Sequence, residues 1–257
     1  MGRLRAGLCS VTFRQLNVNE VIALVKEAGL ECIEWGGDIH VPHGDLEKAR
    51  AVQILMQEAG LRVAAYGSYY RVGESEEQGL SFTSIVETAR TLAAPTIRVW
   101  AGTKGSNEAD NAYVEQVVKD AKRIANLAQQ ENLTVSFEFH RNTLTDTNEA
   151  TSELLKTCNH GNLFSFWQPP HFTSVEYRSN GLKQLLSRLS NIHIFYWPEP
   201  GTRRPLSEAE AEWINYLKLA KTSNLEHPVL LEFVEDDDPD AFRRDAKTLL
   251  NWLESLD

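Results

Sequence analysis

One pattern recurs eight times along the chain: a short run rich in β-branched and aromatic residues, followed in most cases by an amphipathic stretch of helical period. The predicted strands are residues 4–9, 31–35, 62–66, 96–101, 134–140, 163–168, 192–197 and 229–234. Parallel strands that alternate with crossover helices are typical of α/β proteins, and eight of them close a barrel. We therefore predict an α/β fold of the (β/α)8, or TIM barrel, type.

Capping signals mark both ends of the predicted helices. Two pairs have the spacing of an N-cap residue and its capping partner: Asn17 with Glu20, and Ser207 with Glu210. Residues suited to a left-handed C′ position end three helical stretches directly before a strand: Gly29, Gly60 and Asn132. These repeated joints indicate a regular succession of helix and strand.

The length favours one domain. The chain has 257 residues, which is typical of a single α/β barrel, and no linker-like segment divides it. We predict a single domain over residues 1–257. A doubly wound open sheet would also alternate strands and helices, and it remains the alternative. No G-x-G-x-x-G or G-x-x-x-x-G-K-[ST] motif follows a predicted strand, however, so nothing indicates a nucleotide-phosphate site.

The composition limits the partners and the compartment. Hydrophobic residues make up 42% and charged residues 24%, the balance of an ordinary globular protein. The net charge of −10 opposes binding to nucleic acid, because phosphate contacts require clustered lysine and arginine. Cys9, Cys32 and Cys158 lack zinc-knuckle or disulfide spacing, and no segment approaches the roughly 20 apolar residues of a membrane span. We expect a cytoplasmic protein with a small-molecule ligand and no membrane or nucleic-acid partner.

Polar residues at the C-terminal ends of predicted strands are the candidates for function, since a TIM barrel carries its site there. Four polar residues on the last four predicted strands stand in otherwise apolar runs: Glu138, Gln168, His193 and Glu232. Each also has a structural interpretation. A barrel carboxylate such as Glu138 or Glu232 can pair with arginine or lysine, Gln168 can be a hydrogen-bonding amide, and His193 can be a satisfied core histidine.

A closed barrel would bring these four positions together, because they lie on four successive predicted strands. The set offers two carboxylates, an imidazole and an amide oxygen. This oxygen-rich mixture suits Mn2+, Mg2+ or Co2+, with Zn2+ as a further candidate, and disfavours metals that need thiolate ligands. We predict a divalent-metal site formed by Glu138, Gln168, His193 and Glu232.

The segment FEFHRNTLTDT, residues 137–147, resembles the fifth-strand segment of the xylose isomerase-like sugar isomerases and epimerases. That family includes D-tagatose 3-epimerase, hydroxypyruvate isomerase and inosose dehydratase, and the resemblance spans nearly the whole chain. It implies a first metal ligand at Glu138 and further ligands at His193 and Glu232. In the family pattern the sixth strand supplies an Asp and, three residues later, a substrate-contacting His; these positions hold Gln168 and His171 here.

Other positions match the family less closely. Residues 34–42 resemble its second strand and the loop that follows. The amide at Gln168 removes one negative charge and should weaken metal binding. The family's substrate-binding arginine after the seventh strand has two approximate counterparts, Arg203 and Arg204.

The resemblance implies a metal-dependent isomerase or epimerase that transfers a proton next to a carbonyl, with Glu138 and Glu232 as the catalytic pair on opposite sides of the carbon. Which glutamate acts as base stays open. The residues expected to contact the substrate are His171, His140, Trp35, Tyr66, Trp100, Arg203 and Arg204. The family also implies a homo-oligomer.

The loop after the eighth strand reads Glu235-Asp236-Asp237-Asp238, which would repel a phosphate where barrels usually bind one. We therefore expect an unphosphorylated ketose, cyclitol or hydroxy-keto acid as substrate. Three alternatives stay open: a dehydratase or lyase on the same scaffold, a non-catalytic sugar-binding barrel with a degraded metal site, and an endonuclease IV-like DNA repair enzyme. The acidic balance disfavours the last.

Overall fold

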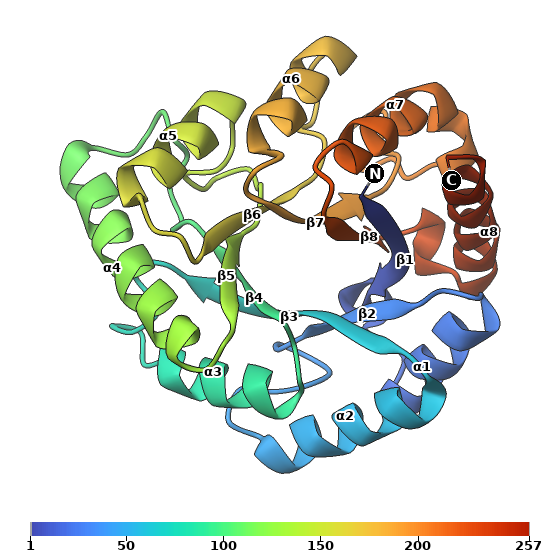
Figure 1. Ribbon diagram of the computed structural model, residues 1–257, viewed down its shortest axis with the longest axis horizontal. Helices are drawn as coiled ribbons and strands as arrows, with labels where there is room; N and C mark the ends of the chain where they lie inside the picture. The colour runs from blue at the N-terminus through green and yellow to red at the C-terminus, as the bar shows by residue number, and fades with distance from the viewer. Residues whose placement is uncertain (1, 257) are drawn as a thin grey trace.

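The computed structural model describes residues 2–256, which form a closed barrel of eight parallel strands in the order β1 to β8 (Figure 1). The strands are β1 (Arg3–Cys9), β2 (Cys32–Gly36), β3 (Arg62–Arg71), β4 (Thr96–Trp100), β5 (Thr134–Phe137), β6 (Leu163–Trp167), β7 (Leu189–Ile194) and β8 (Glu226–Leu231). β8 pairs with β1 and completes the ring. The predicted TIM barrel is confirmed, and the closure excludes the doubly wound open sheet.

Two strands lie earlier in the chain than predicted. β7 was expected over residues 192–197 and β8 over 229–234, whereas each ladder begins three residues earlier and ends three residues earlier. The apolar residues after both ladders, such as Phe195 and Trp197, belong to loops at the mouth of the barrel. Hydrophobicity alone extended the predicted strands into these loops, and the polar Asn191 inside β7 hid its true start.

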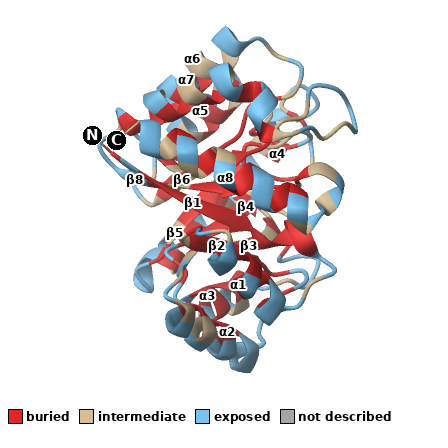
Figure 2. Ribbon diagram, turned by 90° about the vertical axis from the view of Figure 1, so that its right-hand side faces the viewer, coloured by how far each residue is buried: buried red, intermediate tan, exposed pale blue. Residues whose placement is uncertain are grey.

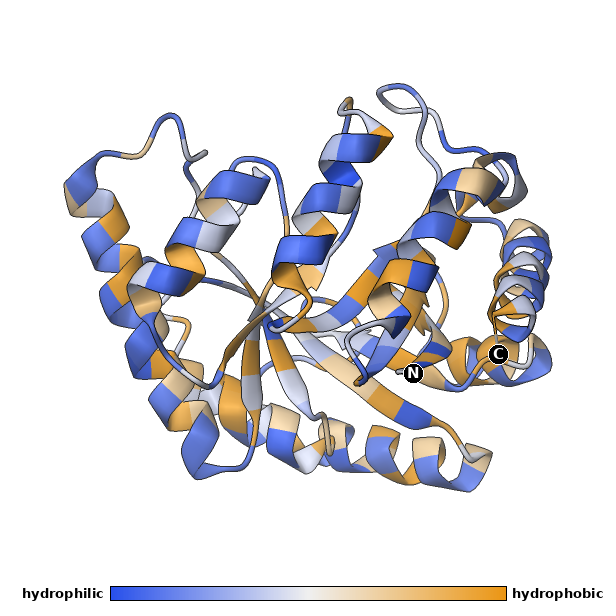
Figure 3. Ribbon diagram, turned by 45° about the horizontal axis from the view of Figure 1, so that its top comes forward, coloured by the Kyte–Doolittle hydropathy of each residue, from blue (hydrophilic) through white to orange (hydrophobic). Residues whose placement is uncertain are grey.

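Within residues 2–256, eight α-helices surround the strands (Figure 1). They are α1 (Val18–Glu27), α2 (Leu46–Ala59), α3 (Phe82–Thr91), α4 (Asn111–Gln130), α5 (Asn148–Cys158), α6 (Val175–Leu185), α7 (Glu210–Lys221) and α8 (Pro239–Ser255), with 3-10 helices η1 (Ser10–Phe13), η2 (Leu206–Ala209) and η3 (Glu235–Asp237). The strands are buried, and the helices carry alternating buried and exposed residues (Figure 2). The same helices carry hydrophobic and hydrophilic stripes (Figure 3). The core therefore lies between the ring of strands and the surrounding ring of helices.

Most of the predicted helix ends are confirmed. Asn17 and Glu20 form a complete capping box at α1. Gly29, Gly60 and Asn132 have φ values of 74°, 73° and 59°, the left-handed conformation predicted for them. The cap predicted at Ser207 is wrong, because this residue lies inside η2 and α7 begins without a side-chain cap. None of the helices in the described part of the chain has both the length and the apolar character needed to cross a bilayer.

A bulge shapes the end of β3 that reaches the mouth. The register between β3 and β4 shifts between Gly67 and Tyr70, and Tyr69 has a φ of 55°. A bulge bends its strand and redirects a side chain, often beside a functional site. β3 therefore continues to Arg71, five residues beyond the predicted strand end at Tyr66, and delivers two side chains to the mouth.

Candidate metal centre and substrate mouth

The four residues predicted as metal ligands meet around the imidazole of His193 in β7. Its Nδ1 lies 3.0 Å from Gln168 Oε1, 3.3 Å from Glu232 Oε2 and 3.9 Å from Glu138 Oε1. These three partners directly follow β6, β8 and β5, and all four side chains are buried. One ligand atom each from Glu138, His193 and Glu232 lies within 4.8 Å of the others, a spacing that could hold a metal ion.

Two more buried charges, Glu34 in β2 and Arg98 in β4, complete the cluster. The Arg98 guanidinium donates from Nε to Glu34 Oε1 at 2.5 Å and from Nη1 to Glu138 Oε2. Glu34 Oε2 accepts from His193 Nε2 at 3.0 Å. Both oxygens of Glu34 are thus engaged, and His193 turns Nδ1 toward the predicted ligands. A carboxylate behind a metal-ligating imidazole fixes the ring and raises its basicity.

Burial opposes the charged form of each of these groups, and opposite charges outweigh it. Burial alone would raise the pKa of Glu34, yet Arg98 and His193 lower that pKa to about 2. Burial likewise opposes ionised Glu232, but His193 and Arg98 hold its pKa below the ordinary value. For His193, burial disfavours the imidazolium, while Glu232 and Glu34 hold the pKa well above its usual range. Both carboxylates are therefore ionised at neutral pH.

The balance of charge fits a divalent cation. The carboxylates of Glu34, Glu138 and Glu232 face one guanidinium, that of Arg98, which leaves two uncompensated negative charges in a buried space. A divalent cation beside a neutral His193 would balance them. Without a cation, a proton on the imidazole supplies part of the missing charge. The donor set of predicted ligands is therefore suited to the metal that it was predicted to bind.

A second group of metal-ligating residues, Cys9, Glu34 and His193, overlaps the first. Both Glu34 oxygens already accept hydrogen bonds from Arg98 and His193. Burial raises the pKa of the Cys9 thiol to about 12, so it stays protonated. The group that contains Glu138 and Glu232 is therefore the better candidate for a metal site.

Aromatic rings form one wall of the mouth beside Glu138. Trp100, at the end of β4, donates from Nε1 to Glu138 Oε2 and stacks on His140 with ring centres 4.6 Å apart. The Arg71 guanidinium lies 4.4 Å from the centre of the indole, and Tyr69 meets the same ring edge-on at 5.5 Å. These contacts connect Trp100 directly, and His140 through Trp100, to the predicted metal ligand Glu138.

The loops after β6 and β7 form a second aromatic wall. His171 stacks on Trp197 with ring centres 5.3 Å apart, and Trp197 stacks on Phe195 at 4.2 Å. Arg203, a predicted substrate residue, lies over the Phe233 ring at 5.0 Å and pairs with Asp237. Burial, followed by the nearby positive charges of two arginines, lowers the pKa of His171, which keeps its imidazole neutral.

Two predicted substrate residues, Trp35 and Tyr66, lie away from the mouth, and a third, Arg204, is exposed. Trp35 and Tyr66 are neighbours in the β2/β3 ladder and are fully buried in the layer between strands and helices. There the Tyr66 hydroxyl donates a hydrogen bond to the Val41 carbonyl at 2.8 Å. Successive side chains alternate along a strand, so Trp35 faces away from the barrel interior into which Glu34 points. Arg204 pairs with the exposed Glu208. We assign no substrate contact to these three residues.

Four residues of the site were not predicted from the sequence: Glu34, Arg98, Tyr69 and Arg71. A signal existed for the first two, because each is a charged residue inside a predicted strand, as Glu138 and Glu232 are. No local signal marks Tyr69 and Arg71, since a bulge in the β3/β4 ladder brings them to the mouth.

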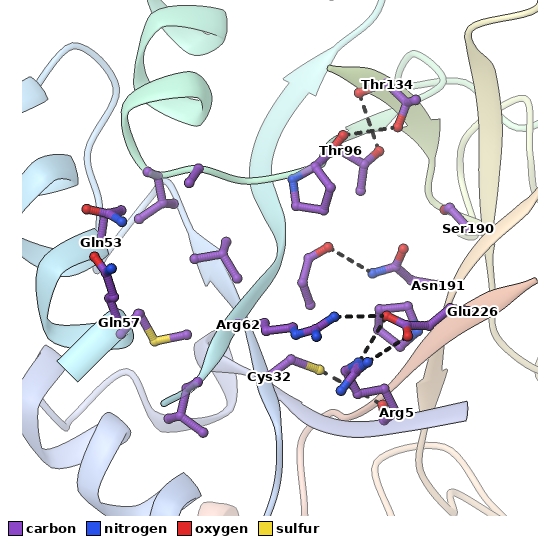
Figure 4. Close-up of a pocket in the computed structure, with 18 residues that line it drawn as sticks. Arg5, Cys32, Gln53, Gln57, Arg62, Thr96, Thr134, Ser190, Asn191 and Glu226 are labelled. Carbon is purple, nitrogen blue, oxygen red and sulfur yellow. Dashed lines mark hydrogen bonds and ion pairs between the residues drawn. The ribbon is translucent and has the colours of Figure 1, made fainter. Parts of the chain in front are cut away.

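A pocket of about 610 Å3 opens at the opposite, N-terminal end of the strands (Figure 4). Its charged groups pair with one another: Arg5 donates to Glu226 and to Glu31, and Arg62 lies 3.6 Å from Glu226. None of the buried polar atoms that lack a partner in residues 2–256 lines this pocket. The N-terminal face of a TIM barrel usually serves stability, so we place the functional site at the other end.

The chain is similar in sequence and in structure to dehydratases of Bacillus anthracis. A curated 3-dehydroshikimate dehydratase from this organism is 28% identical over 171 residues, which cover 62% of this chain and 60% of that protein. The match therefore spans less than two thirds of the relative. The crystal structure of AsbF, a probable 3-DHS dehydratase involved in petrobactin synthesis, has a TM-score of 0.81 at 22% identity and covers 98% of this chain and 99% of that chain.

Two further structures share the barrel. A xylose isomerase-like TIM barrel protein from Mycobacterium smegmatis in complex with magnesium has a TM-score of 0.74 at 15% identity, covering 100% of this chain and 98% of that one. D-psicose 3-epimerase from Clostridium cellulolyticum H10, solved with D-tagatose, has a TM-score of 0.74 at 13% identity, covering 98% and 99%. At these identities the likeness shows the fold alone.

The family itself follows from the sequence profile of the xylose isomerase-like TIM barrels, which matches residues 22–256. The match covers all strands from β2 to β8 and every residue of the candidate metal centre. It confirms the resemblance inferred from the fifth-strand segment. The chain belongs to the xylose isomerase-like TIM barrel family.

Proposed function

We propose that this protein is a divalent-metal-dependent dehydratase that removes water from a hydroxylated cyclic ketone of the 3-dehydroshikimate type. The proposal depends on the convergence of the four predicted ligands on one buried point at the mouth, in a chain whose curated relative is a dehydratase. The sequence favoured an isomerase or epimerase and kept the dehydratase as an alternative. Because the curated relative is a dehydratase, we now place the dehydratase first and the isomerase or epimerase second.

Glu138, Gln168, His193 and Glu232 would hold the cation, with Mg2+ and Mn2+ as the first candidates. When bound, the cation supplies positive charge that polarises a carbonyl and stabilises negative charge on its oxygen. Glu34 fixes the His193 ring through Nε2. Arg98 and Trp100 fix Glu138 through Oε2, which leaves Oε1 turned toward the common point.

We assign the proton transfer in the dehydration to His140. Its Nδ1 lies 2.7 Å from the Arg141 carbonyl oxygen and donates to it, so Nε2 keeps a free lone pair. Nε2 can take the proton from the carbon next to the carbonyl, and the electrons of that C–H bond form the new double bond as the neighbouring C–O bond breaks. The imidazolium then returns its proton to the departing hydroxide, which leaves as water.

The stacked rings of the mouth suit the product of this reaction. A dihydroxylated cyclohexenone carboxylate that loses one water and enolises becomes a dihydroxybenzoate, which is a flat aromatic ring. Trp197 and His171 stack on each other in the second aromatic wall, and a flat aromatic product could extend such a stack in offset geometry. Product and wall therefore match in shape.

An isomerase or epimerase is the second candidate. The observation that favours it is the pair of buried carboxylates, Glu138 and Glu232, which approach His193 Nδ1 from β5 and β8. In that reaction the two glutamates would remove and return one proton, as the sequence predicted. The barrel shared with D-psicose 3-epimerase makes free ketohexoses the substrates to test.

The test combines metal content with product analysis. Protein treated with Mn2+ and freed of excess metal is measured by mass spectrometry and incubated with 3-dehydroshikimate, and dihydroxybenzoate is followed by its ultraviolet absorbance. D-tagatose and D-psicose are tested in parallel for epimerisation. We expect about one metal per chain and an aromatic product, both lost in Glu138→Gln and Glu232→Gln.

The matched control is Glu153→Gln, which makes the same change on the exposed surface of α5 and should behave like the native chain. Epimerised sugar without aromatic product would replace the proposal with the second candidate. A native chain that takes up no Mn2+ would overturn both enzymatic proposals and favour the non-catalytic barrel.

A further inference from the structure

We propose that Arg71 is the residue that binds a carboxylate group of the substrate and so selects acids over neutral sugars at this site. The inference rests on the proposed function, because it concerns a ligand in the same mouth. Arg71 is the last residue of β3 and is partly buried, opposite Trp100 in the β3/β4 ladder.

The first reason is that Arg71 has no anionic partner among residues 2–256. Three other arginines around the mouth are paired: Arg98 with Glu34 and Glu138, Arg178 with Glu212, and Arg203 with Asp237. Within the described residues, the Arg71 side chain makes no hydrogen bond or ion pair, and its one ring contact is with Trp100. In a chain with a net charge of −10, a partly buried guanidinium without a carboxylate is available to an anionic ligand.

The second reason is geometric. The guanidinium lies 4.4 Å from the centre of the Trp100 indole, and that indole is held by its hydrogen bond to Glu138 and its stack on His140. Stacking uses the face of a guanidinium and leaves its N–H groups, which lie in the plane, free for a bidentate bond to a carboxylate. Arg71 is thus held in place by Trp100, and the same indole contacts the predicted metal ligand Glu138.

The third reason separates Arg71 from the other unpaired arginine nearby, Arg141. Arg141 is exposed, and no hydrogen bond, ion pair or ring contact in the described part of the chain holds its side chain. Its charge adds to the positive potential around His171. A mobile side chain loses more conformational entropy on binding than one already held on a ring, so Arg71 is the better anchor.

The kind of anion also follows from charge. A phosphate carries nearly two negative charges and would be repelled by the acidic run at residues 235–238, which forms η3 and the N-cap of α8 at the same end of the barrel. A carboxylate carries one charge and matches a single guanidinium. We therefore infer a monocarboxylate as the group that Arg71 binds.

The experiment measures binding of an unreactive ligand to the Mn2+-loaded protein by calorimetry. The two ligands are 3,4-dihydroxybenzoate and its uncharged amide, which differ in charge and keep the ring and its hydroxyls. We expect the native chain to bind the acid about 10- to 100-fold more tightly than the amide, as for a charge-assisted bidentate bond. Arg71→Gln should abolish this preference and leave the affinity for the amide unchanged, which also shows that the variant is folded.

The matched control is Arg50→Gln, which removes an exposed arginine of α2 that also lacks an ion pair within residues 2–256 and should keep the preference. Equal weakening of acid and amide in Arg71→Gln would overturn the inference, because Arg71 would then only support Trp100. Loss of the preference in Arg141→Gln, with Arg71→Gln unaffected, would overturn it as well. The dehydratase proposal fails separately, by absence of aromatic product from a protein that still prefers the acid.

Discussion

At the scale of single residues, Gln168 is the position that separates this centre from the family pattern. Its Oε1 lies 3.0 Å from His193 Nδ1, so an amide oxygen stands where the resemblance to the family predicts a carboxylate. An amide accepts hydrogen bonds and can bind a cation, but it contributes no net charge. The affinity of the centre for metal should therefore respond strongly to a charge at this one position.

We predict that Gln168→Glu, which is nearly isosteric, lowers the dissociation constant for Mn2+ by at least about tenfold, or about 1.4 kcal/mol, because it adds a carboxylate to the predicted ligands. Isothermal titration at constant pH measures it. The metal-free variant should also melt at a lower temperature than the native chain, since the added charge is buried, and Mn2+ should restore its stability. Gln168→Asn keeps the amide and should bring no gain. Unchanged Mn2+ affinity in Gln168→Glu would place residue 168 outside the metal's coordination.

At the scale of secondary structure elements, the ends of the helices show which local signals carry free energy. The Asn17 side chain accepts hydrogen bonds from the backbone amides of Asn19 and Glu20 at 2.9 and 3.2 Å. In return, the Glu20 carboxylate accepts a hydrogen bond from the backbone amide of Asn17. Ser81 occupies the same N-cap position at α3 and makes no such bond. The two helices thus offer a matched pair for measuring the contribution of a cap.

We predict that Asn17→Ala lowers the free energy of unfolding by about 1 kcal/mol, the usual cost of losing a side-chain cap. Ser81→Ala should change it much less, because no cap hydrogen bond is lost. Urea denaturation of both variants measures the difference. Equal losses in the two variants would mean that the capping box of α1 adds nothing to stability.

At the scale of the whole molecule, buried neutral histidines tie the stability of the closed barrel to pH. His227 in β8 is fully buried beside the β1/β8 seam; its Nδ1 donates to the Ser190 carbonyl at 2.9 Å and its Nε2 meets the Ser223 hydroxyl at 2.6 Å. Burial lowers the pKa of His227, although the bond to Ser190 opposes the shift. Burial also lowers the pKa of His40.

We predict that the native chain loses stability as the pH falls below about 6.5, the ordinary pKa of histidine. There the unfolded chain takes up a proton that the folded chain excludes, so the free energy of unfolding falls by up to about 1.4 kcal/mol per pH unit for each such histidine. His227→Asn should therefore reduce the slope of stability against pH between 5 and 7, whatever its effect at pH 7. Urea titrations at each pH measure the slope, and an unaltered slope would contradict the role of His227.

Much of the fold was predictable because its signals are local. A period of two residues for strands, a helical period between them, and glycines such as Gly29 and Gly60 at the joints depend only on neighbouring residues. Barrel closure then has nearly fixed geometry, so Glu138, Gln168, His193 and Glu232 could be assigned to one end before any coordinates. The predictions failed where local chemistry was ambiguous, as at Ser207 and at the aromatic residues after β7.

Spatial partners, in contrast, depend on strand register and on the face each side chain takes. The pairing of Arg98 with both Glu34 and Glu138 joins three strands across the barrel, and nothing within any one of them specifies it. The bulge that carries Tyr69 and Arg71 to the mouth is likewise a property of the β3/β4 ladder. The sequence by itself was thus sufficient to predict the barrel and the kinds of metal-ligating side chain at its mouth. Which groups touch is decided by non-local packing, because many distant contacts together set the register.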